Sequence, residues 1–310
     1  MNKLIVVIYS KRIGERLLSI CVDIFSSLLK RFRRRDEFLF VSADIFLFGR
    51  EKFSEIIGGR KIDAIIYDCD FGDSVSENNN LMSHFGVKAH VYYINSKRIV
   101  APACKINFQK GYDSFSDELV LNTENARAAV ELALDLAKSG RHEITLCTEN
   151  KGMATEAALI EEYEFAAGSA RRLHHFKGSV MNVLCGSEPL DEVVITTPQW
   201  EKLLAAHMAR QEGAHCAALC CMGEHFNLYA RAQIYGGSSH NEHIRGLLMA
   251  MSVMAQNEFE KDSAAAYLRY AVGMADKLVM EEDEENFALT VSKIVRNRRR
   301  TGDCFENTAQ

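Results

Sequence analysis

Several features that would place this chain in a special class of protein are scarce in its sequence. Its 310 residues include three prolines, scattered at positions 102, 189 and 198, so no proline-rich linker divides it. No apolar run approaches the roughly 18 residues that would indicate a membrane span. The nine cysteines are odd in number and irregularly spaced. That pattern is typical of free thiols in a reducing compartment, and we therefore expect a cytoplasmic protein.

The sequence also has no large excess of positive or of negative residues. The net charge of −5 provides no global attraction to nucleic acid or to an anionic membrane. Two short basic runs, at residues 30–35 and 296–300, are expected to be solvated helix ends, because cations complement the helix macrodipole there. Residues 4–9 have the composition of a strand, so no signal peptide is expected. We expect neither nucleic acid nor a membrane as partner.

What the chain does have is an alternation of short apolar runs and amphipathic segments. Residues 4–9, 38–41 and 63–67 have the apolar composition of buried strands. Between residues 14 and 32, apolar side chains recur at helical spacing. This alternation predicts an α/β fold with a parallel sheet. Further strands are expected at residues 89–94 and 226–235, and further helices at 123–138, 154–170, 243–254 and 264–278.

One stretch joins a buried strand directly to a helix. Residues 192–196 form a short β-branched run that is too short for a helix. Thr197 is expected to cap the following helix with its hydroxyl, and Pro198 suits the first helical position. Ligands collect at such carboxyl ends of strands in α/β proteins. This junction is therefore the first place to look for a site.

The same stretch resembles the signature segment of the isocitrate/isopropylmalate dehydrogenase family, a strand followed by Thr-Glu-Asn-Leu-Phe-Gly-Asp-Ile-Leu-Ser-Asp on a helix. Trp200 falls on the family's Phe, but its two metal-binding aspartates fall on Lys202 and Ala206. A third metal aspartate of the family falls on Gly178. Mg²⁺ and Mn²⁺ require oxygen ligands, which none of these side chains has. We therefore expect no metal site and neither ion as cofactor.

The other functional positions of the family are altered too. The arginines that bind substrate carboxylates fall on Met82 and Tyr92. Glu149 stands at the position of the proton-transfer lysine, and Lys151 takes that position if the match slips by two residues. Lys202 would replace the charge of the metal if it lies over an anionic ligand. The resemblance thus gives Lys151 and Lys202 as the candidate catalytic residues.

Two smaller segments admit both a functional and an ordinary interpretation. Gly236, Gly237 and Ser238 resemble the core of the family loop that wraps the adenine of NAD, which makes them candidate cofactor-binding residues, although small residues also form ordinary turns. Histidines and cysteines concentrate between residues 207 and 225, where Cys216 and Cys220 have the spacing of a zinc pair on a helix. Because free cysteine is a common core residue, we favour a core segment there.

The resemblance covers most of the chain in segment order, although no single motif is intact. It implies an α/β open sandwich of two interleaved lobes around a mixed, mostly parallel sheet. Residues 1–87 and 213–310 would form the terminal lobe, which binds the cofactor in the family. Residues 88–212 would form the central lobe, with a dimer interface on the helix that begins at Pro198. The implied partner is a second copy or a related subunit.

Three functions follow from this pattern. Simultaneous loss of the metal and substrate positions favours a pseudoenzyme, a non-catalytic structural or regulatory subunit that needs no cofactor. The first alternative is an active NAD(P)-dependent oxidoreductase on an altered hydroxy-acid substrate, which would use Lys151 or Lys202. The second alternative is a module that binds a metabolite anion in the retained crevice.

Overall fold

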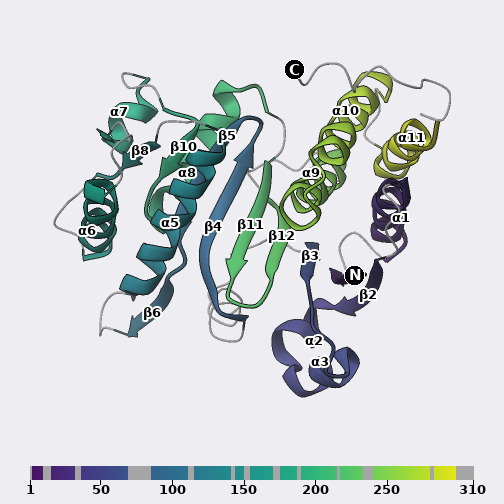
Figure 1. Cartoon of the computed structure of the whole chain (residues 1–310), viewed down its shortest axis with the longest axis horizontal. Helices are drawn as coiled ribbons and strands as arrows, with labels where there is room; N and C mark the ends of the chain where they lie inside the picture. Colours follow the sequence, from purple (N-terminus) through teal and green to yellow (C-terminus); the bar gives the residue numbers. More distant parts are fainter. Residues whose placement is uncertain are drawn as a thin grey trace.

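The chain folds around one large sheet with helices on both of its faces (Figure 1). Ten described strands form this sheet in the order β2-β1-β3-β12-β11-β4-β5-β10-β8-β9, and β6 and β7 form a separate two-stranded sheet. No described helix has the length and the apolar character needed to cross a bilayer. The computed structural model describes residues 2–9, 15–31, 36–68, 85–110, 115–140, 144–149, 154–169, 175–186, 190–214, 217–232, 240–279 and 283–297.

The described elements have the following bounds. The strands are β1 (Leu4–Tyr9), β2 (Glu37–Ser42), β3 (Ala64–Asp68), β4 (Val87–Ile94), β5 (Lys97–Pro102), β6 (Lys105–Lys110), β7 (Phe115–Val120), β8 (Ile144–Cys147), β9 (His175–Gly178), β10 (Val193–Ile195), β11 (Ala217–Gly223) and β12 (Asn227–Ala232). The helices are α1 (Glu15–Arg31), α2 (Ala43–Phe48), α3 (Arg50–Ile57), α5 (Thr123–Gly140), α6 (Ala154–Ser169), α7 (Val180–Leu184), α8 (Pro198–Gln211), α9 (His240–Phe259), α10 (Asp262–Leu278) and α11 (Glu284–Asn297).

The large sheet is parallel toward both edges and antiparallel in its middle. β2, β1, β3 and β12 pair in parallel at one side, and β5, β10, β8 and β9 do so at the other. The pairs β12–β11, β11–β4 and β4–β5 between them are antiparallel. The described sheet is therefore mixed and mostly parallel, as the sequence predicts. It is also continuous across the expected border between the lobes, where β11 pairs with β4; the division into lobes stays a prediction.

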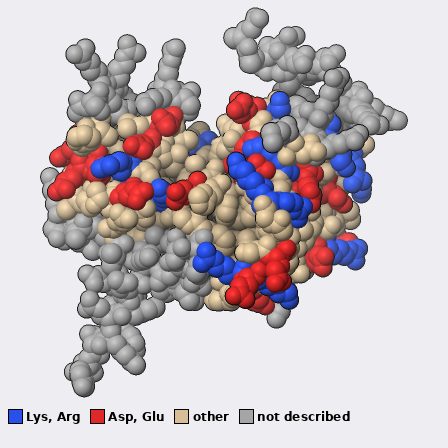
Figure 2. Space-filling model, turned by 60° about the horizontal axis from the view of Figure 1, so that its bottom comes forward, with Lys and Arg blue, Asp and Glu red and all other residues tan. Residues whose placement is uncertain are grey.

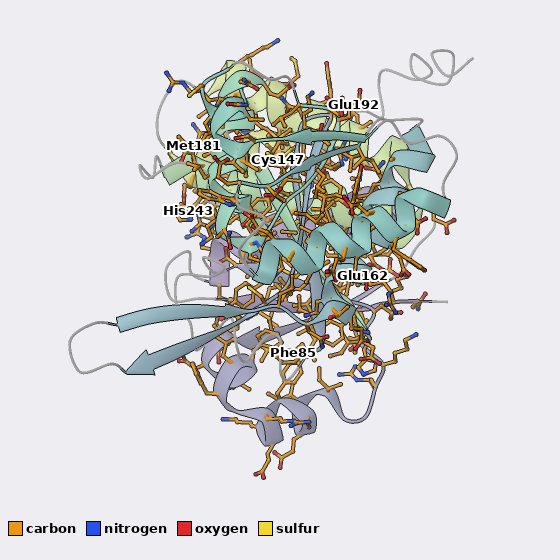
Figure 3. The ribbon with its side chains drawn as sticks, turned by 90° about the vertical axis from the view of Figure 1, so that its left-hand side faces the viewer. Phe85, Cys147, Glu162, Met181, Glu192 and His243 are labelled. Carbon is orange, nitrogen blue, oxygen red and sulfur yellow. The ribbon has the colours of Figure 1, made fainter. Side chains whose placement is uncertain are left out.

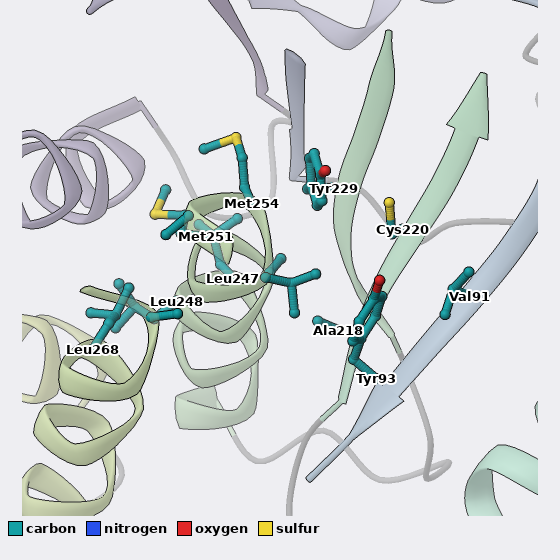
Figure 4. Packing of buried hydrophobic residues seen from close by; sticks show 14 of the residues in the cluster. Val91, Tyr93, Ala218, Cys220, Tyr229, Leu247, Leu248, Met251, Met254 and Leu268 are labelled. Atoms are coloured by element: carbon teal, nitrogen blue, oxygen red, sulfur yellow. The ribbon is translucent and has the colours of Figure 1, made fainter. Parts of the chain in front are cut away.

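A first hydrophobic core fills the face of the sheet under α1, α5, α6 and α9 to α11. Figure 4 shows its centre, where Leu247, Met251 and Met254 of α9 pack beside Tyr229 of β12 and Tyr93 of β4. These side chains are less than a tenth exposed. Burial of such large apolar and aromatic groups is the main stabilising contribution on this face.

A second core fills the opposite face, under α2, α3, α7 and α8. Phe46 and Phe53 of α2 and α3 pack edge to face, with ring centroids 5.3 Å apart. Leu204 of α8 lies in the same core. Because side chains alternate along a strand, neighbours on β4 enter different cores: Tyr92 lies in the second and Tyr93 in the first.

The sequence locates the strongly periodic elements well. β1 has the predicted bounds, and α1 begins and ends one residue inside the expected helix. Residues 97–102, 105–110 and 115–120, in contrast, form three strands that sequence patterns did not indicate. β6 and β7 pair with each other alone among the described strands and extend as an arm away from the body of the protein (Figure 3). Their polar composition lacks the pattern of a buried strand.

Candidate functional site

The junction between β10 and α8 folds as the sequence predicts, except at the helix cap. Pro198 is the first residue of α8, and Thr197 precedes it as the N-cap. The hydroxyl of Thr197 makes no capping hydrogen bond, so the predicted side-chain cap is wrong. That hydroxyl is buried instead, with no hydrogen-bond partner among the described residues. The first turn is closed by the Trp200 N–H, which donates to the Thr197 carbonyl at 3.0 Å.

The three positions at which the family would have metal aspartates lie on β9 and α8. Lys202 is exposed on α8 and has no hydrogen bond or ion pair within the described residues, and Ala206 is partly buried one turn later. Gly178 ends β9, where its carbonyl accepts from Thr148 N at 3.1 Å. Across the described part of the chain, no three Asp, Glu, His or Cys side chains gather in a group that could hold a metal ion. This donor set does not fit Mg²⁺ or Mn²⁺.

Glu149, at the position of the family's lysine, caps a helix. Its Oε2 accepts from Ser179 Oγ at 2.8 Å and from Met181 N at 3.1 Å, at the start of α7. The bond from Ser179, followed by the backbone N–H groups, holds the pKa of this carboxyl below its ordinary value. The carboxylate therefore stabilises the amino end of α7. Lys151 lies outside the described residues, and its role stays a prediction.

A second carboxylate, that of Glu156 in the first turn of α6, connects three elements. It is fully buried, and its Oε1 accepts from Glu149 N at 3.2 Å, Gln199 Nε2 at 3.3 Å and Trp200 Nε1 at 3.1 Å. The indole N–H of Trp200 is a donor that the family's phenylalanine does not have. Glu156 thus joins the end of β8 to the first turns of α6 and α8.

A third carboxylate, that of Glu201, is on the buried face of α8 and lies against β4. Its Oε2 is 3.2 Å from Nδ1 of His90, and the two side chains are 9% and 5% exposed. Tyr92 hydrogen-bonds to Glu201 through its phenol. Burial, and then the charge of Glu201, raise the pKa of Tyr92 and also that of the Cys104 thiol, the latter to about 12. Glu201 therefore fixes α8 to the strand below it.

This arrangement changes the chemistry available at the position of a family arginine. The raised pKa keeps the phenol of Tyr92 protonated, so the group there is a neutral donor rather than a cation. Tyr92 is also only 3% exposed and lies in the second core. A neutral, buried phenol cannot replace the planar, charged fork with which arginine binds a carboxylate.

The remaining sequence candidates lie partly outside the described residues. Gly236, Gly237 and Ser238 lie outside the described residues, so cofactor binding there stays a prediction. The alternative of a zinc pair on a helix is wrong, because Cys220 lies on a strand, β11, where it is fully buried, while Cys216 lies outside the described residues. Burial raises the pKa of this thiol. Its neighbour Cys221 is equally buried, which confirms the expectation of a core segment.

Comparison with known proteins supports the fold. No family model and no curated protein matches the sequence. The crystal structure of isocitrate dehydrogenase from Methylococcus capsulatus matches 95% of this chain and 99% of its own, with a TM-score of 0.72 at 14% identity. The TT0538 protein from Thermus thermophilus matches 96% of this chain and 69% of its own, with a TM-score of 0.73 at 14% identity. The chain thus has an isocitrate dehydrogenase-like fold.

Proposed function

We propose that this chain is a non-catalytic structural or regulatory subunit with an isocitrate dehydrogenase-like fold. The observation that carries the proposal is that, in this chain, side chains at the family's functional positions make contacts within the fold. Glu149 caps α7, and Tyr92 is buried against Glu201. Both side chains make contacts within the fold: the exposed Glu149 holds the start of α7, and Tyr92 is withdrawn into the second core. A site retuned for another substrate would keep some of the family's functional residues, whereas every matched functional position within the described residues carries a different side chain.

Electrostatics argues in the same direction. The ammonium group of Lys202 replaces a carboxylate at a position that would face a divalent cation in the family. The ammonium group and a divalent cation bound next to it would repel each other. Lys202 is exposed, and among the described residues it has no carboxylate partner that would offset this repulsion. A cation held in this crevice would therefore be destabilised by the very helix that binds it in the family.

The surface formed by α7 and α8 suits a protein partner. Leu203 on α8 is 45% exposed and Met181 on the adjoining α7 is 51% exposed. The arm of β6 and β7 adds a second feature, because a two-stranded hairpin is only marginally stable by itself in water. Elsewhere, basic and acidic side chains intermingle over the described part of the face in Figure 2. We propose a second copy or a related subunit as the partner that covers α7, α8 and the arm.

Two experiments test the proposal. Light scattering after gel filtration should show an oligomer that Leu203→Glu dissociates, while Leu289→Glu, a matched change at a 42% exposed leucine on α11, leaves it intact. Thermal unfolding should not shift on addition of NAD⁺, NADP⁺, Mg²⁺ or Mn²⁺. A saturable stabilisation by a nicotinamide cofactor would contradict the proposal and support the active oxidoreductase.

A further inference from the structure

An arginine at the start of β5 lies on the face of the sheet opposite α8. The Arg98 guanidinium is 4.5 Å from the ring centroid of Tyr93, its cross-strand partner on β4. Its Nη1 donates to the carbonyls of Asn95 at 2.9 Å and Lys97 at 2.8 Å, in the turn between the two strands. Both acceptors are neutral, and these bonds use only part of the guanidinium donors. Within the described residues, the hydrogen bonds that hold this guanidinium therefore go to neutral groups.

A second arginine approaches the same place from α10. Arg269 Nε donates to Ser252 Oγ at 3.1 Å, and its Nη2 donates to Gln256 Oε1 at 2.9 Å. The next residue of α9, Asn257, donates to the Tyr93 hydroxyl at 3.1 Å. The contacts thus run without interruption from Arg98 through Tyr93 and α9 to Arg269, and again both acceptors of the arginine are neutral.

The charge of Arg269 also acts on the guanidinium group of Arg98. Burial lowers the pKa of Arg98, and the charge of Arg269 lowers it further. Burial lowers the pKa of Arg269 as well. The acidic side chains whose charges act on them are Glu192 and Asp262, yet within the described residues neither arginine has a carboxylate at salt-bridge distance. Partly buried charges in proteins are normally paired, because removing a charge from water is unfavourable.

We propose that Arg98 and Arg269 together bind a small oxyanion, a phosphate or carboxylate group, beside the ring of Tyr93. Guanidinium forks match the oxygens of such anions, and the existing hydrogen bonds to neutral acceptors preorganise both side chains. The anion would compensate the two neighbouring positive charges. Because Tyr93 lies in the first core and α8 covers the second, this site is separate from the crevice discussed above and does not depend on the proposed function.

Anion-dependent thermal unfolding tests the site. The full chain is titrated with inorganic phosphate, and in a parallel series with malonate, while sodium chloride keeps the ionic strength constant. We expect a saturable rise of the melting temperature with at least one of the two anions. The anion that reaches half of its effect at the lower concentration identifies the ligand as a phosphate or a carboxylate. Arg98→Gln and Arg269→Gln should each weaken this binding roughly tenfold or more, as expected for the loss of a charged hydrogen-bond donor.

The control is Arg127→Gln, the same chemical change at an exposed arginine on α5 that is paired with Glu162. This variant should bind as tightly as the unmodified chain. If Arg269→Gln fails to fold, Arg269→Lys keeps the charge but loses the fork, and it should still bind more weakly. The proposal is overturned if no saturable shift exceeds that of chloride. It is equally overturned if the variants and the control bind alike, which would indicate an adventitious ion only.

Discussion

Two carboxylates, the partly buried Glu258 on one face of the sheet and the buried Glu201 on the other, show how differently the two halves of this fold use the same chemical group. Glu258 of α9 accepts from Lys3 Nζ at 3.2 Å, Asn227 Nδ2 at 2.8 Å and the Tyr229 hydroxyl at 2.8 Å. It has a permanent cation and two neutral donors. Glu201 of α8 has a phenol and a histidine, whose charge depends on its protonation.

The difference concerns what each carboxylate holds together. Glu258 ties the start of the chain and β12 to α9, and it lies far in sequence from every position at which the family has a functional residue. Glu201 lies next to such a position and holds α8 against Tyr92, which occupies another. Around Glu258 the first face is thus an ordinary scaffold. On the second face, Tyr92, at a position that serves a ligand in the family, is part of the core.

The largest expected effect is on Glu201. Glu201→Ala should lower the free energy of unfolding by about 3 kcal/mol, because it leaves the buried His90 and the phenol of Tyr92 without their acceptor. Urea denaturation measures the change. Glu201→Gln, which keeps an acceptor oxygen, should lose less. A neutral result for the alanine variant would mean that water satisfies this cluster and that it does not anchor α8.

Glu258→Ala should follow, with a loss of about 2 kcal/mol by the same measurement. Its side chain is 13% exposed and its partner Lys3 is 24% exposed, so water replaces part of the lost interaction. Glu37→Ala serves as the control, because its ion pair with Arg60 is exposed and should change stability little. A loss larger than that of Glu201→Ala would reverse the order of the two faces.

Trp200→Phe introduces the residue that the family has at this position, and it should cost about 1 kcal/mol. The substitution keeps an aromatic ring but removes the N–H that donates to the buried Glu156. Urea denaturation again gives the value. Equal or greater stability of the variant would indicate that the tryptophan was not recruited to hold Glu156.

The smallest expected effect depends on pH and concerns Glu149. Hydrogen bonds from Ser179 and from the backbone of α7 lower the pKa of this carboxyl from the ordinary value of 4.5. A carboxyl with a lowered pKa in the folded state stabilises the protein above its ordinary pKa, and this contribution disappears as the pH falls through the lowered value. The unmodified chain should therefore be more stable than Glu149→Gln at pH 7. That advantage should shrink as the pH falls below about 4.5; a difference that stays constant would contradict the capping role.

Local pattern made much of the fold predictable. The apolar runs of β1 and β3 and the periodicity of α1 are strong enough to give their bounds to within a residue or so. The inward position of Glu201 was also recoverable, because residues 201, 204, 205 and 208 share one face of α8 and the last three are apolar. The arm of β6 and β7 carried a weaker signal, since only two apolar residues alternate in β6 and none do so regularly in β7.

The contacts between the end of β8 and the first turns of α6, α7 and α8 were not predictable in the same way. Glu149 caps a helix of five residues that no periodicity could reveal. Glu156 and Trp200 lie 44 residues apart in the sequence and meet only because β8 and β10 are neighbours in the sheet. Resemblance to the family located the altered positions, whereas the structure was needed to show that two of their side chains, Glu149 and Tyr92, have partners inside the fold.

Titration of the purified chain with Mn²⁺, followed by the electron paramagnetic resonance signal of the free ion, tests the central claim most directly. If the crevice no longer holds a divalent ion, the signal should rise with added Mn²⁺ as it does in buffer alone, with and without NADP⁺. A saturable loss of signal that Lys202→Asp strengthens would contradict the account, because it would place a working cation site on α8.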